Sequence, residues 1–183
     1  MEEKDEINTP EEFAAQVLRG ENRYYQEVTI TKVQGACPYG HREGDTFQVT
    51  AMNSDGLCGS LLKAILPPVI TQHYGGDILW GDLPGTFKGS CPEAGKVAVA
   101  VRRVERDCSQ LLKTEAPFTD MTGKGYPLLD RYRLMVEVLD IAHDCYWGHR
   151  VGDRFEVDPF NVGGACCLLY GQFYPYLHVL LSG

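Results

Sequence analysis

The sequence has no long hydrophobic run and little positive charge. No apolar stretch approaches the roughly 18 residues that a membrane-spanning helix needs, so we expect no membrane partner. Lysine and arginine together number 17 against 25 aspartates and glutamates, which gives a net charge of -8. Because binding to a phosphate backbone needs concentrated Lys and Arg, we also expect no nucleic-acid partner.

Several common signatures of function are missing too. The chain has no Walker loop, no Gly-x-Gly-x-x-Gly fingerprint and no His-Glu-x-x-His motif. Its first six residues are acidic rather than hydrophobic, unlike a signal peptide. Seven cysteines, an odd number, disfavour a disulfide scaffold in a chain without a secretory signal. We therefore expect a cytoplasmic protein whose thiols are structural, metal-binding or catalytic.

What the sequence does contain is one pattern written twice. Copies that begin at Cys37 and Cys145, 108 residues apart, both read Cys-x-x-Gly-His-Arg-x-Gly-Asp-x-Phe-x-Val. In each copy another cysteine follows, 21 residues after the first. Residues 23–75 and 131–183 align without gaps and are identical at 17 positions. A unit of this length indicates the duplication of a small domain rather than a solenoid repeat.

Each copy predicts two strands joined by a tight turn and followed by a helix. The Cys-x-x-Gly-His-x-x-Gly-Asp segment is the turn, because glycine adopts positive φ without strain, and a proline is expected to end each helix. A capping box also predicts a short helix near the N-terminus. The elements expected are helices at 9–19, 57–66 and 165–174, and strands at 28–30, 47–49, 96–101, 136–138 and 155–157.

These elements predict an α+β fold made of two tandem related β-β-α(-β) units packed as a pseudo-symmetric pair. The expected order is an N-terminal helical segment (1–22), a first unit (23–103), a surface linker (104–130) and a second, shorter unit (131–183). We expect an intramolecular pseudo-dimer. The second unit stops where the first begins its extension, so its last strand would come from the linker, the N-terminal segment or another subunit of a homo-oligomer.

The pattern resembles a provisional, serially numbered family of small bacterial and archaeal proteins of uncharacterised function. The resemblance rests on the Cys-x-x-Gly-His-x-x-Gly-Asp-x-Phe-x-Val core, on Gly56-Leu-Cys58 and on a later Cys91-Pro92 before a last strand. Residues 28–103 resemble the whole unit, and residues 136–183 resemble it without the last Cys-Pro and strand. The resemblance implies an architecture and a site, and no particular activity.

The first interpretation of the repeated turn is a metal site. Cys and His are the usual ligands of Zn²⁺, four in a tetrahedron, and zinc or iron are the metals we consider. Asp45 or Asp153 would orient the imidazole of the preceding histidine. The candidate ligands are Cys37, His41, Cys58 and Cys91 in the first copy, and Cys145, His149 and Cys166, with Cys167 as a weaker fourth, in the second.

The second interpretation is catalysis, and the third is purely structural. A cysteine near a helix start or a histidine gains thiolate character, and the carboxylate four residues after each histidine could hold its tautomer. The candidate catalytic residues are Cys37, His41, Asp45, Cys145, His149 and Asp153. In the structural interpretation the cysteines are small buried hydrophobes and the glycines and aspartates only shape a hairpin turn.

Two functions from different classes follow. One is a small cytoplasmic enzyme that acts on a small metabolite through the Cys/His/Asp site, with or without metal. The other is a non-catalytic metal- or ligand-binding module that assists a partner. Arg42 and Arg150 are candidates to bind an anionic group of the ligand. His178 lies in an aromatic stretch, residues 170–176, that would line an apolar pocket or form a core or dimer face.

Overall fold

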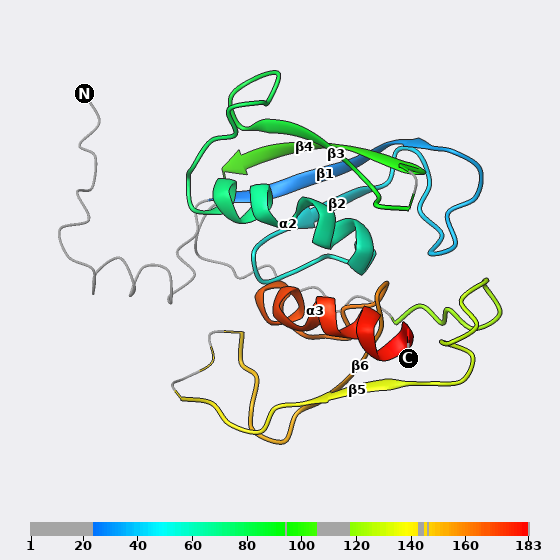
Figure 1. Cartoon of the computed structure of the whole chain (residues 1–183). Coiled ribbons are helices and arrows are strands. Elements are labelled where there is room, and N and C mark those ends of the chain that lie inside the picture. Colours follow the sequence, from blue (N-terminus) through cyan, green and yellow to red (C-terminus); the bar gives the residue numbers. More distant parts are fainter. Residues whose placement is uncertain (1–23, 94, 106–117, 143–144, 146, 183) are drawn as a thin grey trace.

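The structure, a computed structural model, describes residues 24–93, 95–105, 118–142, 145 and 147–182. It confirms the α+β class (Figure 1). The predicted helix at 9–19 and Cys108 lie outside the described residues. The elements are β1 (Tyr24–Val33), β2 (Thr46–Val49), α2 (Gly59–His73), β3 (Thr86–Ser90), β4 (Val97–Glu105), β5 (Leu134–Glu137), β6 (Arg154–Val157) and α3 (Cys167–Ser182).

The strands form two antiparallel sheets. The larger has the order β2-β1-β4-β3, and the smaller pairs β5 with β6. Val28 lies opposite Phe47 in the first sheet, and Val136 lies opposite Phe155 in the second. These two pairs are 108 residues apart, so the two hairpins share one register. We call β1, β2, α2, β3 and β4 the first half of the molecule, and β5, β6 and α3 the second half.

The two helices lie between the two sheets. Figure 1 shows the four-stranded sheet, α2, α3 and the β5–β6 hairpin as successive layers. The buried side chains of β1 alternate with half-buried ones, and Val28 and Ile30 are buried against α2. One continuous apolar cluster runs through both halves and includes Leu61, Val157 and Tyr170. Burial of this shared core is the main stabilising contribution to the fold.

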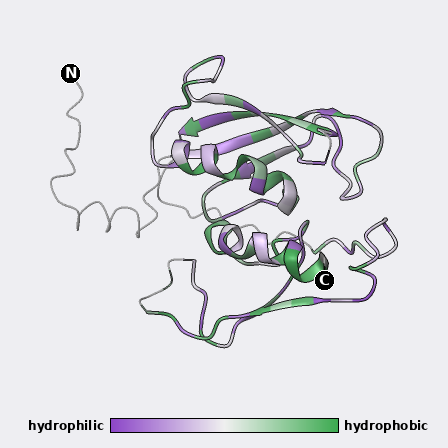
Figure 2. Ribbon diagram, in the orientation of Figure 1, coloured by the Kyte–Doolittle hydropathy of each residue, from purple (hydrophilic) through white to green (hydrophobic). Residues whose placement is uncertain are grey.

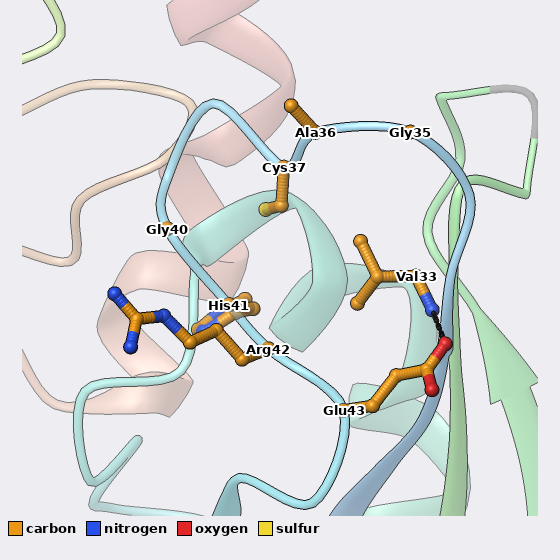
Figure 3. Close-up of a pocket in the computed structure, with 8 residues that line it drawn as sticks. All are labelled: Val33, Gly35, Ala36, Cys37, Gly40, His41, Arg42 and Glu43. Carbon is orange, nitrogen blue, oxygen red and sulfur yellow. Dashed lines mark hydrogen bonds between the residues drawn. The ribbon is translucent and has the colours of Figure 1, made fainter.

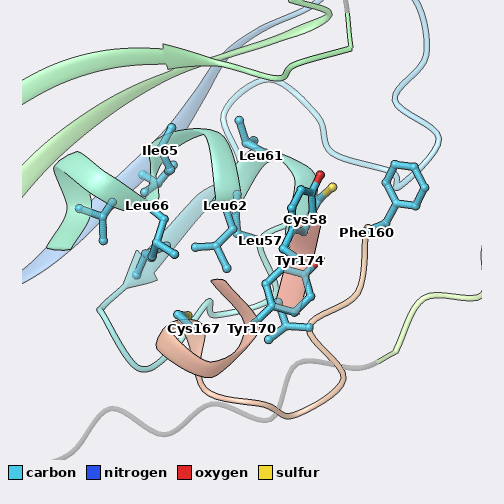
Figure 4. Close-up of a cluster of buried hydrophobic side chains, with 14 of the residues drawn as sticks. Leu57, Cys58, Leu61, Leu62, Ile65, Leu66, Phe160, Cys167, Tyr170 and Tyr174 are labelled. Atoms are coloured by element: carbon cyan, nitrogen blue, oxygen red, sulfur yellow. The ribbon is translucent and has the colours of Figure 1, made fainter. Parts of the chain in front are cut away.

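The start of each helix is tied to the other half of the molecule. The N–H of Gly59 in α2 donates to the carbonyl of Phe160, and the N–H of Cys167 in α3 donates to the carbonyl of Met52. Both donors and both acceptors are 108 residues apart, so the two hydrogen bonds are reciprocal. Figure 4 shows how Tyr170 and Tyr174 of α3 reach the start of α2 beside Cys58.

The predicted ends of both main helices are wrong, because each helix continues through its prolines. Pro67 and Pro68 lie inside α2, and Pro175 lies inside α3. A proline removes the N–H that would bond to the carbonyl four residues earlier. In α3 that carbonyl belongs to Gly171, and it accepts a hydrogen bond of 3.4 Å from Lys63 Nζ instead.

In α2 the two freed carbonyls belong to Lys63, which is half-buried, and Ala64, which is exposed. Water can therefore solvate them. Packing stabilises the helix after the prolines, since Val69 and Gln72 are fully buried against the rest of the first half. Tertiary burial outweighs the local cost of proline here.

Two further expectations differ from the structure. Strand β3 was not predicted, because its sequence Thr-Phe-Lys-Gly-Ser has weak strand propensity, yet it pairs with β4 over five residues. The expected surface linker also contributes to the core: Met121 and Leu129 are buried. The C-terminal turns of α3 are strongly hydrophobic (Figure 2). Even so, none of the described helices is both long and apolar enough to cross a bilayer.

Candidate functional site

The first Cys–His–Asp turn connects β1 to β2 and is held by its own backbone. Gly40 and Gly44 have φ values of 102° and 90°, in the left-handed region that favours glycine. The carboxylate of Asp45 accepts a 2.7 Å hydrogen bond from the N–H of Arg42, and the N–H of Asp45 donates back to the carbonyl of Arg42. Asp45 therefore closes the turn upon itself and does not orient the imidazole of His41 through any hydrogen bond described.

His41 ties this turn to the start of α2. Its side chain is buried, and its Nε2 accepts a hydrogen bond of 3.2 Å from the N–H of Cys58. The ring also lies edge-on to Phe47 and tilted against Tyr39. Burial lowers the pKa of His41, and the nearby carboxylate of Asp45 only partly opposes this. The imidazole is therefore a neutral acceptor at Nε2, with its proton on Nδ1.

Three cysteines of the first half come together at this place. Cys58 is the N-cap residue of α2. Burial raises the pKa of its thiol to about 12, against the opposing effect of the N–H groups of Leu61 and Ser60, and the neighbouring Cys91 and Cys37 raise it further. Burial also raises the pKa of Cys91. The structure thus brings Cys37, Cys58 and Cys91 within electrostatic range of one another, as free thiols.

These thiols do not assemble into a metal centre. In the part of the chain that the structure describes, no group of three or more His, Cys, Asp or Glu side chains is arranged to hold a metal ion. The His41 Nε2 atom, one of the two ring nitrogens through which a histidine can bind a metal, accepts the N–H of Cys58.

The second turn repeats the hydrogen bonds that the aspartate and the histidine make in the first. The N–H of Arg150 donates to Asp153 over 2.8 Å, and the N–H of Cys166 donates to His149 Nε2 over 3.2 Å. Burial raises the pKa of the Cys166 thiol, which lies in electrostatic range of Cys145. Cys167 is fully buried and contributes to the core. As in the first half, the histidine and aspartate of the second turn form hydrogen bonds to the backbone.

The first turn also encloses an open cavity of about 420 Å³. Eight residues between Val33 and Glu43 line it, among them Cys37, His41 and Arg42 (Figure 3). The thiol of Cys37 points into the space that the turn encloses (Figure 3), and the exposed Arg42 is one of the lining residues. The carboxylate of Glu43 is engaged, since it accepts a 2.9 Å hydrogen bond from the N–H of Val33.

The aromatic stretch around His178 belongs largely to the core. Tyr170 donates to the carbonyl of Asp158, and the hydroxyls of Tyr174 and Ser60 lie 3.1 Å apart. Both tyrosines are buried, whereas His178 is exposed on α3 with its ring 5.0 Å from that of Tyr174. The buried positions of Tyr170 and Tyr174 agree with the prediction of a core, and the pocket near His178 stays a prediction.

Three residues near the thiols, Tyr39, Glu93 and Tyr126, were not predicted from the sequence. Tyr126 donates to the carboxylate of Glu93, two residues after Cys91, and the ring of Tyr126 contacts that of Phe160. Tyr39, inside the motif, contacts His41. The only sequence signal for Glu93 was its place directly after Cys91-Pro92, and Tyr126 gave none because its partners are distant in the chain.

Comparisons with family models, with curated proteins and with solved structures gave no significant match to this chain.

Proposed function

We propose that this protein is a ligand-binding module that holds a small organic anion in the cavity beside Cys37. The observation that carries the proposal is the position of Cys37. It is the half-buried cysteine that lines the cavity, while His41 and Asp45 are occupied in holding the turn. A thiol in an open cavity contacts the carbon atoms of a ligand without the desolvation cost of a charged group.

The charge beside the cavity favours an anionic ligand. Arg42 is an exposed lining residue of the cavity, and its guanidinium has several donors in the planar arrangement that suits a carboxylate or phosphate. Glu43 lines the same space, but its carboxylate is oriented by the N–H of Val33. A carboxylate or phosphate in this space would therefore find Arg42 as its partner.

The electrostatics favour binding over acid–base catalysis. A general base needs a free lone pair near the proton it removes, and the Nε2 lone pair of His41 already accepts the N–H of Cys58. Cys58, with a pKa of about 12, stays protonated at neutral pH. An enzyme of the kind that the sequence predicts would thus have to act through Cys37 alone. We therefore keep the enzyme as the second candidate function.

We further propose that the two halves descend from one duplicated unit and form a pseudo-symmetric pair. The reciprocal bonds from Gly59 to Phe160 and from Cys167 to Met52 support this proposal, because in a two-fold interface each contact occurs a second time with the two sides exchanged. Six free cysteines among the described residues support a reducing, cytoplasmic location.

Competition between two alkylating reagents tests the ligand site. Iodoacetate and iodoacetamide react with thiols in the same way but differ in charge. Site-resolved mass spectrometry of the native protein should find Cys37 alkylated well before Cys58, with iodoacetate favoured by Arg42. In Arg42→Gln the ratio of iodoacetate to iodoacetamide rates at Cys37 should fall about fivefold, the effect of a unit charge at roughly 4 Å in water.

Arg150→Gln is the matched control, since it removes the equivalent arginine of the second turn. It should leave the rate ratio at Cys37 unchanged. A ratio at Cys37 that is the same in the wild type and in Arg42→Gln would show that Arg42 does not recruit anions. Alkylation of Cys58 ahead of Cys37 would remove the basis of the proposed site.

A further inference from the structure

Among the described residues, the second half of the molecule has an open sheet edge. In the first half, β1 lies between β2 and β4. In the described residues, β5 pairs with β6 alone, although β5 and β1 occupy equivalent places in the two hairpins. β5 lies on the side of the molecule away from the four-stranded sheet (Figure 1). A two-stranded sheet is marginally stable, and an unpaired edge is a template for another strand.

The backbone groups at this edge can be assigned from the hydrogen bonds to β6. The N–H of Val138 donates to Asp153, and the carbonyl of Val138 accepts from Gly152. Backbone groups of alternate residues point to the same side of a strand. The N–H and carbonyl groups of Arg133, Met135 and Glu137 therefore point away from β6, toward the open edge.

Equivalent positions are covered in the first half and uncovered in the second. Gln72 near the end of α2 is fully buried, whereas Leu180, 108 residues later in α3, is 65% exposed. Val28 on β1 is fully buried, but Val136 on β5 is only partly buried. Among the described residues, these positions of the second half thus lack the cover that β3 and β4 give to the first.

We propose that β5 pairs antiparallel with β5 of a second copy of this chain, about a two-fold axis at Met135. The strand is self-complementary about that residue. Arg133 lies opposite Glu137 of the partner subunit, and Leu134 lies opposite Val136 of the partner subunit. The residues that meet as hydrogen-bonded pairs are 133, 135 and 137, the same three whose backbone groups face the open edge. The product is a four-stranded sheet with the order β6-β5-β5-β6.

Charge supports this register. Within one chain, Arg154 binds Glu137 at 3.0 Å and Arg133 binds Glu156 at 3.0 Å. Pairing about Met135 places Arg133 of the partner subunit beside Glu137, so that charges of alternating sign cross the joined sheet. Opposite charges on facing strands stabilise a sheet, and like charges directly opposite destabilise it. The pairing is a closed two-fold contact, so it makes dimers and not fibres.

Sedimentation velocity of the full chain tests the proposal. The wild type should sediment as a dimer, with twice the 20.4 kDa mass of one chain. Met135→Lys places two like charges at the axis and should sediment as a monomer. Met135→Thr, which keeps strand propensity without charge, should remain dimeric. A wild type that stays monomeric up to about 100 µM overturns the proposal, because its dissociation constant would then be weaker than that of an ordinary specific dimer. A Met135→Lys variant that sediments as a dimer overturns it as well.

Hydrogen exchange on the wild type gives a second test that needs no folded variant. The amide groups of Arg133, Met135 and Glu137 should gain protection as the protein concentration rises through the dimerisation range, and those of β4 should not change. Protection that is independent of concentration overturns the proposal, because the edge would then be covered within one chain.

Discussion

At the scale of single residues, the repeated motif separates into parts with different roles. His41 and Asp45 are candidates for metal binding, for catalysis or for a purely structural role in the turn. In the structure, the histidine accepts the N–H of Cys58, and the aspartate accepts the N–H of Arg42. A buried polar group must find a partner, and the backbone at the helix start and in the turn supplies it. Cys37 is left as the motif residue that faces the cavity.

Acid should weaken the fold through His41. Burial lowers the pKa of the folded imidazole below the ordinary 6.5, so the unfolded chain binds this proton at a higher pH than the folded chain does. The stability that depends on neutral His41 is complete above about pH 6.5 and is lost as the pH falls through the lowered pKa of the folded state. His41→Gln keeps an acceptor and removes this titration.

Thermal unfolding at about pH 7.5 and about pH 5.5, on either side of the ordinary histidine pKa, checks this prediction. The loss of Tm on acidification should be smaller in His41→Gln than in the wild type. His178→Gln, at an exposed position of α3, should lose as much as the wild type does. An undiminished loss in His41→Gln would assign the acid sensitivity to other groups.

Two buried glutamines are a second residue-scale feature. Gln26 on β1 and Gln72 on α2 are fully buried, and neither amide has a hydrogen-bond partner among the described residues. Their equivalents in the second half are Leu134 and Leu180. An unsatisfied buried group costs about 1–3 kcal/mol. The double substitution Gln26→Leu, Gln72→Leu should therefore raise the free energy of unfolding by about 2 kcal/mol or more.

Urea denaturation measures this change, and Gln34→Leu at an exposed position is the control, with an expected effect within about 0.5 kcal/mol. A lower free energy of unfolding in the double variant would mean that the two amides gain more from internal water than the added apolar packing supplies.

At the scale of helices and strands, packing between the halves decided what local propensity could not. A Cβ atom at Gly59 would lie 2.1 Å from the Tyr170 hydroxyl and 3.0 Å from the Pro159 carbonyl. The glycine is therefore required by close approach of the two helices, and it has no need of positive φ. The same proximity allows the N–H of Gly59 to reach Phe160.

Gly59→Ala should lower the free energy of unfolding by about 3 kcal/mol, the upper range for overpacking. Gly171→Ala is the matched control within the same helix pair. Its Cβ would meet only the movable end of Leu66 at 2.9 Å, and alanine gains helix propensity. Tyr170→Leu introduces the residue found at the equivalent position of the first half, Leu62. Added to Gly59→Ala, it should recover part of the lost free energy of unfolding in denaturation experiments. Equal losses for both alanine variants would contradict this account.

At the scale of the whole molecule, the two halves share one core and exchange hydrogen bonds at both helix starts. We therefore expect them to unfold together. Trp147 is buried in the second half and Trp80 is 74% exposed in the first. In Trp80→Phe, Trp147 is the sole tryptophan. Its fluorescence change should coincide with the loss of far-ultraviolet circular dichroism along a urea titration. A fluorescence change that precedes the dichroism change would show that the second half unfolds by itself.

The sequence by itself determined the elements whose signals are local. Alternating apolar residues located β1, β2, β5 and β6, and glycine spacing located both turns, because pleat and positive φ depend on neighbouring residues. It also placed Cys37, Cys58 and Cys91 in one candidate site. It did not give the length of the helices, since the burial that carries α2 past Pro67 comes from residues distant in the chain.

Only the tertiary structure decided what the motif residues do. The same His and Asp suit a metal site, a catalytic site or a capped turn as long as their partners are unknown. The partner of His41 Nε2 is a backbone N–H 17 residues away. The strand that covers β1 in the first half, β4, has no counterpart beside β5 among the described residues. Such contacts are long-range, and no local pattern of residues encodes them.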